Sequence, residues 1–370
     1  MKRVVILCVW LFSVVAGHAQ LSLDECRRLA RENYPEIRQY DLVHQTEQYN
    51  LSNAARAWIP QIAFSAQATW QTDAPNFPKE LTGMLAQQGL EIPGLRKDQY
   101  KVALELNQTI WDGGKSVADK RIARAEAAEQ KTMTDVDLYE LEGRVDDLYF
   151  GILLLDERIA QTNLTLNLLR SNLEKVRALQ RNGVAMQSDA DVLEAELLSV
   201  GQQLIQFESS CDSYRRMLGI FIGQKVGDRK LQRPSAVQPL SGESARPELA
   251  MFAAKIDRLT AQEKMVKSSS MPRLGFFAQG YYGYPGLDYM QSMMNSDWSW
   301  NAMLGVKLSW NFGAYYTQKN NLNKLRISRQ QVEVQRDVFL FNMNLQAAQE
   351  NGDIARLRKA IADDDRIVAL

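Results

Sequence analysis

Few side chains in this sequence could carry out chemistry. Only 2 histidines and 3 cysteines occur in 370 residues, and His18 and Cys8 both lie near the amino terminus. His44, Cys26 and Cys211 remain. They are too few for a zinc cluster, for a disulfide framework, or for a Cys–His nucleophile with a spare partner. We therefore expect no catalytic residue, no cofactor, no metal site and no enzymatic activity.

The charge composition excludes a class of partner. The 44 basic residues are balanced by 44 acidic residues, so the formal net charge is zero. A protein that binds nucleic acid normally carries a basic excess, so no nucleic acid is expected among the partners. The acidic run Asp363–Asp365 could suggest a metal site, but we interpret it as the solvated face of a helix.

Residues 1–19 have the composition of a secretory signal peptide. Lys2 and Arg3 precede a short apolar run, and the small residues Gly17 and Ala19 suit cleavage after Ala19. Beyond this segment no run approaches the roughly 20 apolar residues of a membrane-spanning helix. The mature chain is therefore expected to be soluble, peripheral, or to cross a membrane as strands.

Four segments alternate apolar and polar side chains with a period of two, which predicts strands. They span residues 61–72, 100–111, 273–284 and 298–311. Strands of about ten residues with aromatic ends are typical of outer-membrane barrels, although two hairpins of a soluble sandwich would alternate in the same way. The smallest barrels have about eight strands, so a membrane barrel would need several copies of this chain. The tryptophans expected at the membrane interfaces are Trp70, Trp111, Trp298, Trp300 and Trp310.

The chain repeats itself internally. Ile59–Gln61 matches Met271–Arg273, and Trp111–Gly114 resembles Trp310–Gly313. These matches predict a duplication in which each copy has a helix, two strands and a long helix. The predicted domains are the signal peptide 1–19, a first repeat 20–240 with a helical hairpin at 115–223 and a linker, and a second repeat 241–370 with a long helix at 314–370.

A heptad pattern follows the first pair of predicted strands. Apolar residues recur with 3-4 spacing over Leu138–Val176 and again over Leu193–Phe221. Sustained heptads predict a left-handed coiled coil with a neighbouring helix. We expect Asn182–Gly183 to end the first helix, and Ser188 or Asp189 to cap the second.

These features resemble the TolC-like outer-membrane efflux proteins, which are the outer membrane factors of tripartite efflux and type I secretion systems. The resemblance covers essentially the whole mature chain. It rests on Leu23–Cys26, Asn33–Pro35, Ile59–Pro60, the strand exits Trp111–Gly114 and Trp310–Gly313, and the hairpin segments Gly183 and Asp191–Glu196.

The resemblance implies a mixed fold. Four strands per chain would complete a twelve-stranded membrane β-barrel in a homotrimer, and a long α-helical coiled-coil barrel would continue it as a periplasmic tunnel. The spacing from Gly114 to Gly183, applied to Gly313, runs past Leu370. The last returning helix of the second repeat is therefore expected to be missing.

The resemblance also implies a function in the outer membrane. Such ducts passively conduct drugs, small molecules or secreted polypeptides, received from an inner-membrane pump of the RND or ABC type through a periplasmic adaptor. A stand-alone diffusion pore and a surface-anchored structural coiled-coil protein are the alternatives. The hairpin tip would dock the adaptor, unless it is a mere connection. Its residues are Asn182, Gly183, Val184, Ala185 and Met186.

Overall fold

The computed structural model describes residues 20–89, 92–235 and 246–369, so the expected signal peptide lies outside the described residues. The chain divides into two compact units. One comprises Met1–Asp41 and Lys131–Glu248, and the other Leu42–Gln130 and Leu249–Leu370. Helices α2 (Gln39–Arg56) and α4 (Lys115–Arg181) each contribute residues to both units.

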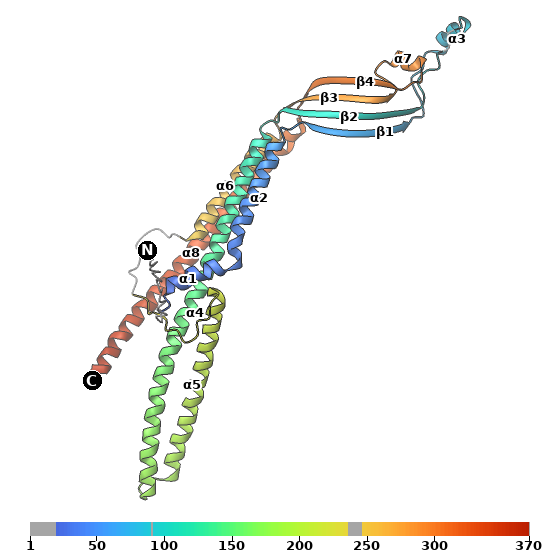
Figure 1. The fold of residues 1–370 in the computed structure, drawn as a ribbon. Coiled ribbons are helices and arrows are strands. Elements are labelled where there is room, and N and C mark those ends of the chain that lie inside the picture. Colours follow the sequence, from blue (N-terminus) through green and yellow to red (C-terminus); the bar gives the residue numbers. More distant parts are fainter. Residues whose placement is uncertain (1–19, 90–91, 236–245, 370) are drawn as a thin grey trace, which may run out of the picture. The chain divides into compact units, whose positions relative to one another are not determined.

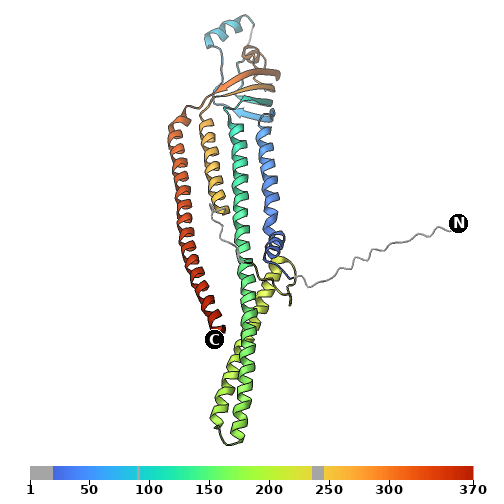
Figure 2. The same cartoon turned by 90° about the vertical axis from the view of Figure 1, so that its left-hand side faces the viewer.

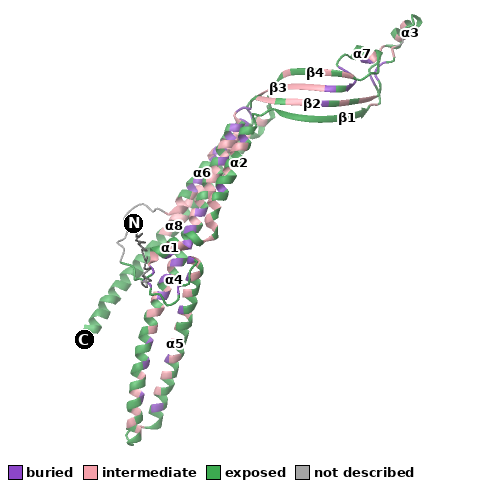
Figure 3. Ribbon diagram, viewed as in Figure 1, coloured by how far each residue is buried: buried purple, intermediate pink, exposed green. Residues whose placement is uncertain are grey.

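The first unit is helical. Helix α1 (Leu23–Asn33) begins at Ser22, whose hydroxyl accepts the amide of Glu25 at 3.2 Å. It leads through the short helix η1 (Pro35–Arg38) into α2 and contacts α5 (Gln187–Ile222). The core contains Cys26 and Ala30 of α1, Leu138, Leu141, Val145, Tyr149 and Ile152 of α4, and Cys211 and Leu218 of α5. Most of these core residues of α4 and α5 occupy predicted heptad positions, so the coiled-coil seam is confirmed in this part of the two helices (Figure 3).

Helices α4 and α5 form the predicted hairpin (Figure 1). Helix α4 ends at Arg181, and Gly183 takes a φ of 74°, a left-handed conformation that glycine adopts without strain. The start of α5 differs from the prediction, because the capping position is Met186 rather than Ser188 or Asp189. Asp189 lies one turn inside the helix, where its carboxylate accepts the Met186 amide at 2.9 Å.

The second unit contains one antiparallel sheet with the strand order β1-β2-β3-β4. The strands are β1 (Gln61–Trp70), β2 (Asp98–Trp111), β3 (Arg273–Tyr284) and β4 (Ser299–Ser309). The four predicted strands are therefore confirmed, with small differences at their ends. Strand β1 stops at Trp70, and both Trp298 and Trp310 lie just outside β4.

The same order of elements occurs twice around this sheet. The first occurrence runs from α2 through β1 and β2 into α4, and the second from α6 (Pro247–Ser268) through β3 and β4 into α8 (Gly313–Ala369). Figure 2 shows α2, α4, α6 and α8 leaving the same end of the sheet. The two copies join where β2 pairs with β3. Two short helices that the sequence analysis did not predict, α3 (Lys79–Gln87) and α7 (Tyr289–Met294), lie in the loops at the other end.

Pro60 and Pro272 mark the two places where a helix gives way to a strand. Neither α2 nor α6 continues to its proline, since the ring removes a backbone donor and clashes with the preceding turn. Among the described residues, no helix combines the length and the apolar composition needed to cross a membrane.

Candidate functional site

The first surface to consider is the hairpin tip, Asn182–Met186. The turn is closed by backbone hydrogen bonds, in which the amides of Gly183 and Val184 donate to the carbonyl oxygens of Gln180 and Leu179, each at 2.9 Å. The side chains of Val184 and Met186 are 73% and 74% exposed. Because both apolar side chains are largely exposed, they leave a small apolar surface available for contact with another molecule.

The flanks of the tip are held by polar contacts. Arg177 of α4 pairs with Glu194 of α5 at 2.6 Å, and Gln187 donates to Asp191 at 2.7 Å. The first bond connects the two helices just above the turn, and the second fixes the first turn of α5. The tip is thus presented on a braced support, which suits a docking element better than a loose connection would.

The five predicted tryptophans lie at the two ends of the sheet. Trp70, Trp298 and Trp300 lie at the end that carries the long loops, and Trp111 and Trp310 lie at the helix end. At the loop end Trp298 stacks on Tyr100 with ring centroids 5.7 Å apart, and Tyr282 contacts both Trp298 and Trp300. The aromatic side chains therefore form two belts, separated by the length of a strand.

Between these belts, one face of the sheet is apolar. The register places Phe64 opposite Leu104 and Ala278 opposite Leu304. This face also carries Ile62, Ala66, Ala68, Val102, Leu106, Phe276, Ala302, Val306 and Leu308. Most of its large side chains are exposed, and Phe64 and Leu304 are 72% and 74% accessible, whereas Leu106 and Phe276 are half-buried. Figure 3 shows β1 exposed along its whole length. An exposed apolar surface of this extent marks contact with lipid or protein.

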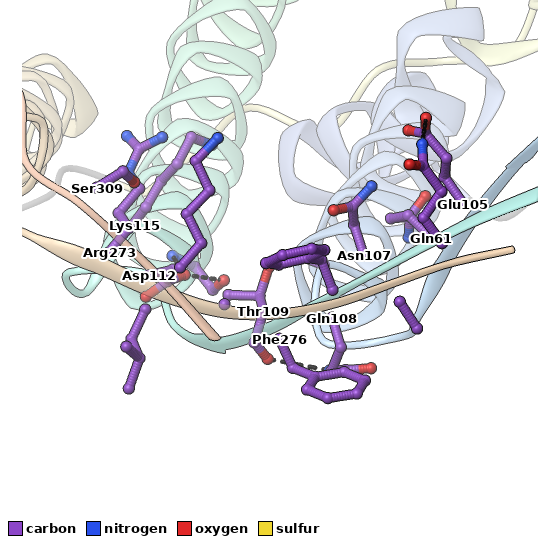
Figure 4. Close-up of a pocket in the computed structure, with 18 of the residues that line it drawn as sticks. Gln61, Glu105, Asn107, Gln108, Thr109, Asp112, Lys115, Arg273, Phe276 and Ser309 are labelled. Atoms are coloured by element: carbon purple, nitrogen blue, oxygen red, sulfur yellow. Dashed lines mark hydrogen bonds between the residues drawn. The ribbon is translucent and has the colours of Figure 1, made fainter. Parts of the chain in front are cut away.

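The opposite face is polar and holds a cavity. In successive rows of the register, Gln61 lies opposite Asn107, and Glu105 lies opposite Gln279. Gln279 links two charges, because its side chain accepts a hydrogen bond from Lys101 at 3.2 Å and donates one to Glu105. The cavity, of about 620 Å³, lies at the helix end of this face (Figure 4).

Most residues that line the cavity carry an amide, hydroxyl or charged group, and the others include Phe276, Phe277 and Met303. Figure 4 shows Arg273, Lys115 and Asp112 on one side and Gln61 and Glu105 on the other. Asp112 caps α4, since its carboxylate accepts hydrogen bonds from the backbone amides of Gly114 at 2.9 Å and Ser116 at 2.6 Å. Lys115 pairs with Asp119 at 2.7 Å. The sequence analysis missed this cavity, although the alternation that predicted a polar face was available to it.

A second polar cluster lies in the first unit, where α4 meets the chain that follows α5. Arg215 donates to both carboxylate oxygens of Asp156, at 3.0 and 2.8 Å, and to the carbonyl oxygens of Gly227 and Arg229. Burial raises the pKa of the neighbouring Cys211 thiol, which keeps it protonated and unreactive. This cluster fastens a loop and offers no chemistry.

Comparisons with known proteins point in one direction. The family described as outer membrane efflux protein matches residues 27–223, which is just over half of the chain. A search of curated protein sequences gives no match.

Solved structures share the fold at low sequence identity. The outer membrane protein VceC from Vibrio cholerae superposes with a TM-score of 0.62 at 14% identity, over 86% of this chain and 75% of that one. The outer-membrane channel OprN gives 0.62 at 13% identity, over 86% and 71%. The CmeC outer membrane channel of Campylobacter jejuni gives 0.59 at 14% identity, over 86% and 68%.

Proposed function

Because this chain belongs to the outer membrane efflux protein family, whose members are outer-membrane channels with periplasmic helical extensions rather than enzymes, we propose that it is the exit duct of an export system. In this role it passively conducts small molecules or polypeptides, which an inner-membrane pump delivers through a periplasmic adaptor. The observation that carries the proposal is the two-faced sheet, which is apolar and exposed on one side and polar on the other.

The apolar face of the sheet suits contact with lipid, and the polar face suits contact with water. Lipid accepts a surface of Phe, Leu, Ile and Val side chains flanked by aromatic belts, because aromatic rings favour the headgroup region. The polar face, with Gln61, Asn107 and Gln279, suits a water-filled conduit. We therefore assign the apolar face to the outer-membrane lipid and the polar face to the lumen, with Trp70, Trp298 and Trp300 in one interface and Trp111 and Trp310 in the other.

The sheet requires further copies of the chain. Strands β1 and β4 form its two edges, and no other described strand pairs with the outer side of either one. In lipid the backbone groups of such an edge must find hydrogen-bond partners. Pairing β4 of one copy with β1 of the next would satisfy both edges, and three copies would close a sheet of twelve strands around the lumen. We propose this homotrimer as the working unit.

The hairpin tip then serves as the docking site for the adaptor. Val184 and Met186 supply apolar contact area, and Asn182, Gly183 and Ala185 shape the turn that presents it. This assignment agrees with the exposure of the tip and with the polar bonds that brace its flanks. A diffusion pore without partners would have no use for an exposed apolar tip.

The duct proposal is tested by measuring the conductance of the protein, purified from its native outer membrane, in planar lipid bilayers. Its mass in detergent, measured by native mass spectrometry, should be that of three chains. We expect discrete conductance steps from the trimer. A protein that forms trimers but never conducts would be a structural coiled-coil protein, and the duct proposal would be wrong.

The docking proposal is tested with Val184→Glu, which places a charge in the apolar tip. We expect export in cells to be lost while the trimer and its bilayer conductance stay unchanged, because the Val184 side chain is largely exposed in its own chain. Gln203→Glu, which adds the same charge at an exposed position of α5, is the control and should leave export intact. Export that survives Val184→Glu would mean that the tip is only a connection.

A further inference from the structure

We propose that the polar face of the sheet selects anions, and that the cavity at its helix end binds an amphipathic organic anion as cargo. The proposal rests on the assignment of this face to the lumen. It concerns the chemical class of the transported substrate, which the duct function alone leaves open.

The first argument is the charge on this face. Within the described residues of the four strands, the register places three cations here, Lys101, Arg273 and Lys307, against one carboxylate, Glu105. Glu105 and Lys101 are joined through the amide of Gln279 and offset each other. Arg273 and Lys307 therefore account for the excess positive charge.

The second argument is that these two cations are available. Both side chains are exposed, and neither makes an ion pair or a hydrogen bond with another described residue. Each acidic group that lines the same cavity already has a partner: Asp112 caps α4, Asp119 pairs with Lys115, and Glu105 accepts a hydrogen bond from Gln279. An incoming anion would thus meet an unpaired guanidinium and an unpaired ammonium group.

The third argument is the space beside them. Lys307 lies opposite Gly275, and Phe277 lies opposite Gly305. A Cβ at Gly305 would lie 3.0 Å from the Phe277 ring, so the ring fills the space above this glycine. The cavity, of about 620 Å³, therefore combines cations with an aromatic surface and with Met303. This combination fits a ligand with one acidic group and one apolar ring, and such a ligand fills only part of that volume.

Confinement strengthens the preference. In a narrow lumen with low-dielectric walls the field of like charges is focused, which concentrates ions of the opposite sign. In the proposed trimer, three copies of Arg273 and Lys307 would surround one passage. A guanidinium group also recognises a carboxylate or sulfonate through two parallel hydrogen bonds, so it can bind the anion as well as attract it.

The test measures ion selectivity in the same bilayers. Under a gradient of potassium chloride, the reversal potential of the native trimer should show a preference for chloride. The double variant Arg273→Gln and Lys307→Gln should lose this preference, whereas Arg273→Lys with Lys307→Arg, which keeps both charges, should retain it. Thermal unfolding of each trimer shows whether the substitutions disturb the fold; both residues are exposed, and we expect no change.

Block of the current measures binding of the cargo class directly. 2-Naphthoate should block the native channel, and the double Gln variant should require about tenfold more of it, because charge-assisted hydrogen bonds are lost. Naphthylmethylammonium, which has the same ring and the opposite charge, should block poorly. A channel that prefers potassium, or that both probes block equally, would overturn the anion proposal alone. A trimer without any conductance would overturn the duct function and this proposal together.

Discussion

The indole nitrogen of Trp310 donates a hydrogen bond of 3.0 Å to the carbonyl oxygen of Ser270, two residues before Pro272. The first copy of the repeat has an equivalent bond, in which the side-chain amide of Gln108 donates at 2.8 Å to the carbonyl of Trp58, two residues before Pro60. Each helix-to-strand bend is thus braced by a side-chain donor on the second strand of its copy or next to its end. The two copies use different residues for the same support.

This hydrogen bond predicts that substitution of Trp310 lowers the stability of the protein more than the same substitution of Trp111. Trp310→Phe keeps an aromatic ring but removes the donor, so the carbonyl oxygen of the buried Ser270 loses a hydrogen-bond partner. We expect the free energy of unfolding to fall by about 1 kcal/mol. Trp111→Phe is the matched control, because no hydrogen bond of the Trp111 indole to another described residue is found. Thermal unfolding in detergent compares them, and equal losses would contradict the brace.

A second prediction concerns Gly113 and Gly114, which both have left-handed backbone conformations, with φ of 70° and 85°. A Cβ at Gly113 would lie 2.7 Å from the Cβ of Met271, whereas one at Gly114 would meet nothing within 4 Å. Gly114→Ala should cost about 1 kcal/mol from backbone strain alone. Gly113→Ala should cost clearly more, since the start of α4 can no longer lie against the bend before β3.

The stability of purified trimers of the two glycine variants measures this difference. If Gly113→Ala were no worse than Gly114→Ala, the close approach between the two copies of the repeat would not be needed for folding. The comparison separates the two costs, because both positions require the same unusual backbone conformation.

The third prediction contrasts two neighbouring arginines of α5. Arg215 is bound to Asp156 and to two carbonyl oxygens, whereas the exposed Arg216 has Asp212 as its one ion-pair partner among the described residues. Arg215→Ala should lower the free energy of unfolding by about 2 kcal/mol, because it leaves several acceptors without a donor. Arg216→Ala should cost less than about 1 kcal/mol, as exposed ion pairs usually do. Chemical denaturation measures both, and similar losses would argue against the fastening role of Arg215.

The fourth prediction is a loss of stability at alkaline pH. Burial raises the pKa of the Cys26 thiol from 9.0 to about 12, and burial also raises the pKa of the Tyr149 hydroxyl from 10.0 to about 12. Folding keeps both groups protonated. The contribution of the two groups to the free energy of unfolding is therefore complete below their unfolded-state pKa values. It is lost as the pH rises toward 12.

Unfolding free energies measured between pH 7 and pH 12 should thus fall mainly above pH 9. Cys26→Ala should make the fall shallower, because one of the two buried groups can no longer ionise. Tyr49→Phe, at a tyrosine that is 68% exposed, is the control for substitution at the protein surface. A profile that is flat to pH 12 would show that neither group limits stability.

The sequence by itself determined the four strands with their two faces, and the long helices that follow them. Successive side chains of a strand point to opposite sides, so the alternation around Phe64 and Leu304 was enough to predict an apolar and a polar face. Heptad spacing likewise predicted which residues of α4, such as Leu138 and Val145, would be buried. These predictions succeeded because they depend on local geometry alone.

Only the tertiary structure decided how distant segments meet. The pairing of β2 with β3, the bond from Trp310 to Ser270, and the cavity beside Arg273 all join residues from separate parts of the chain. The register of these strands and the distances between these residues depend on packing between separate segments. The spacing of apolar residues along one segment does not determine that packing. The short helices α3 and α7 were missed for a related reason. They are too short for an apolar period to be recognised, and contacts at the loop end hold the second of them.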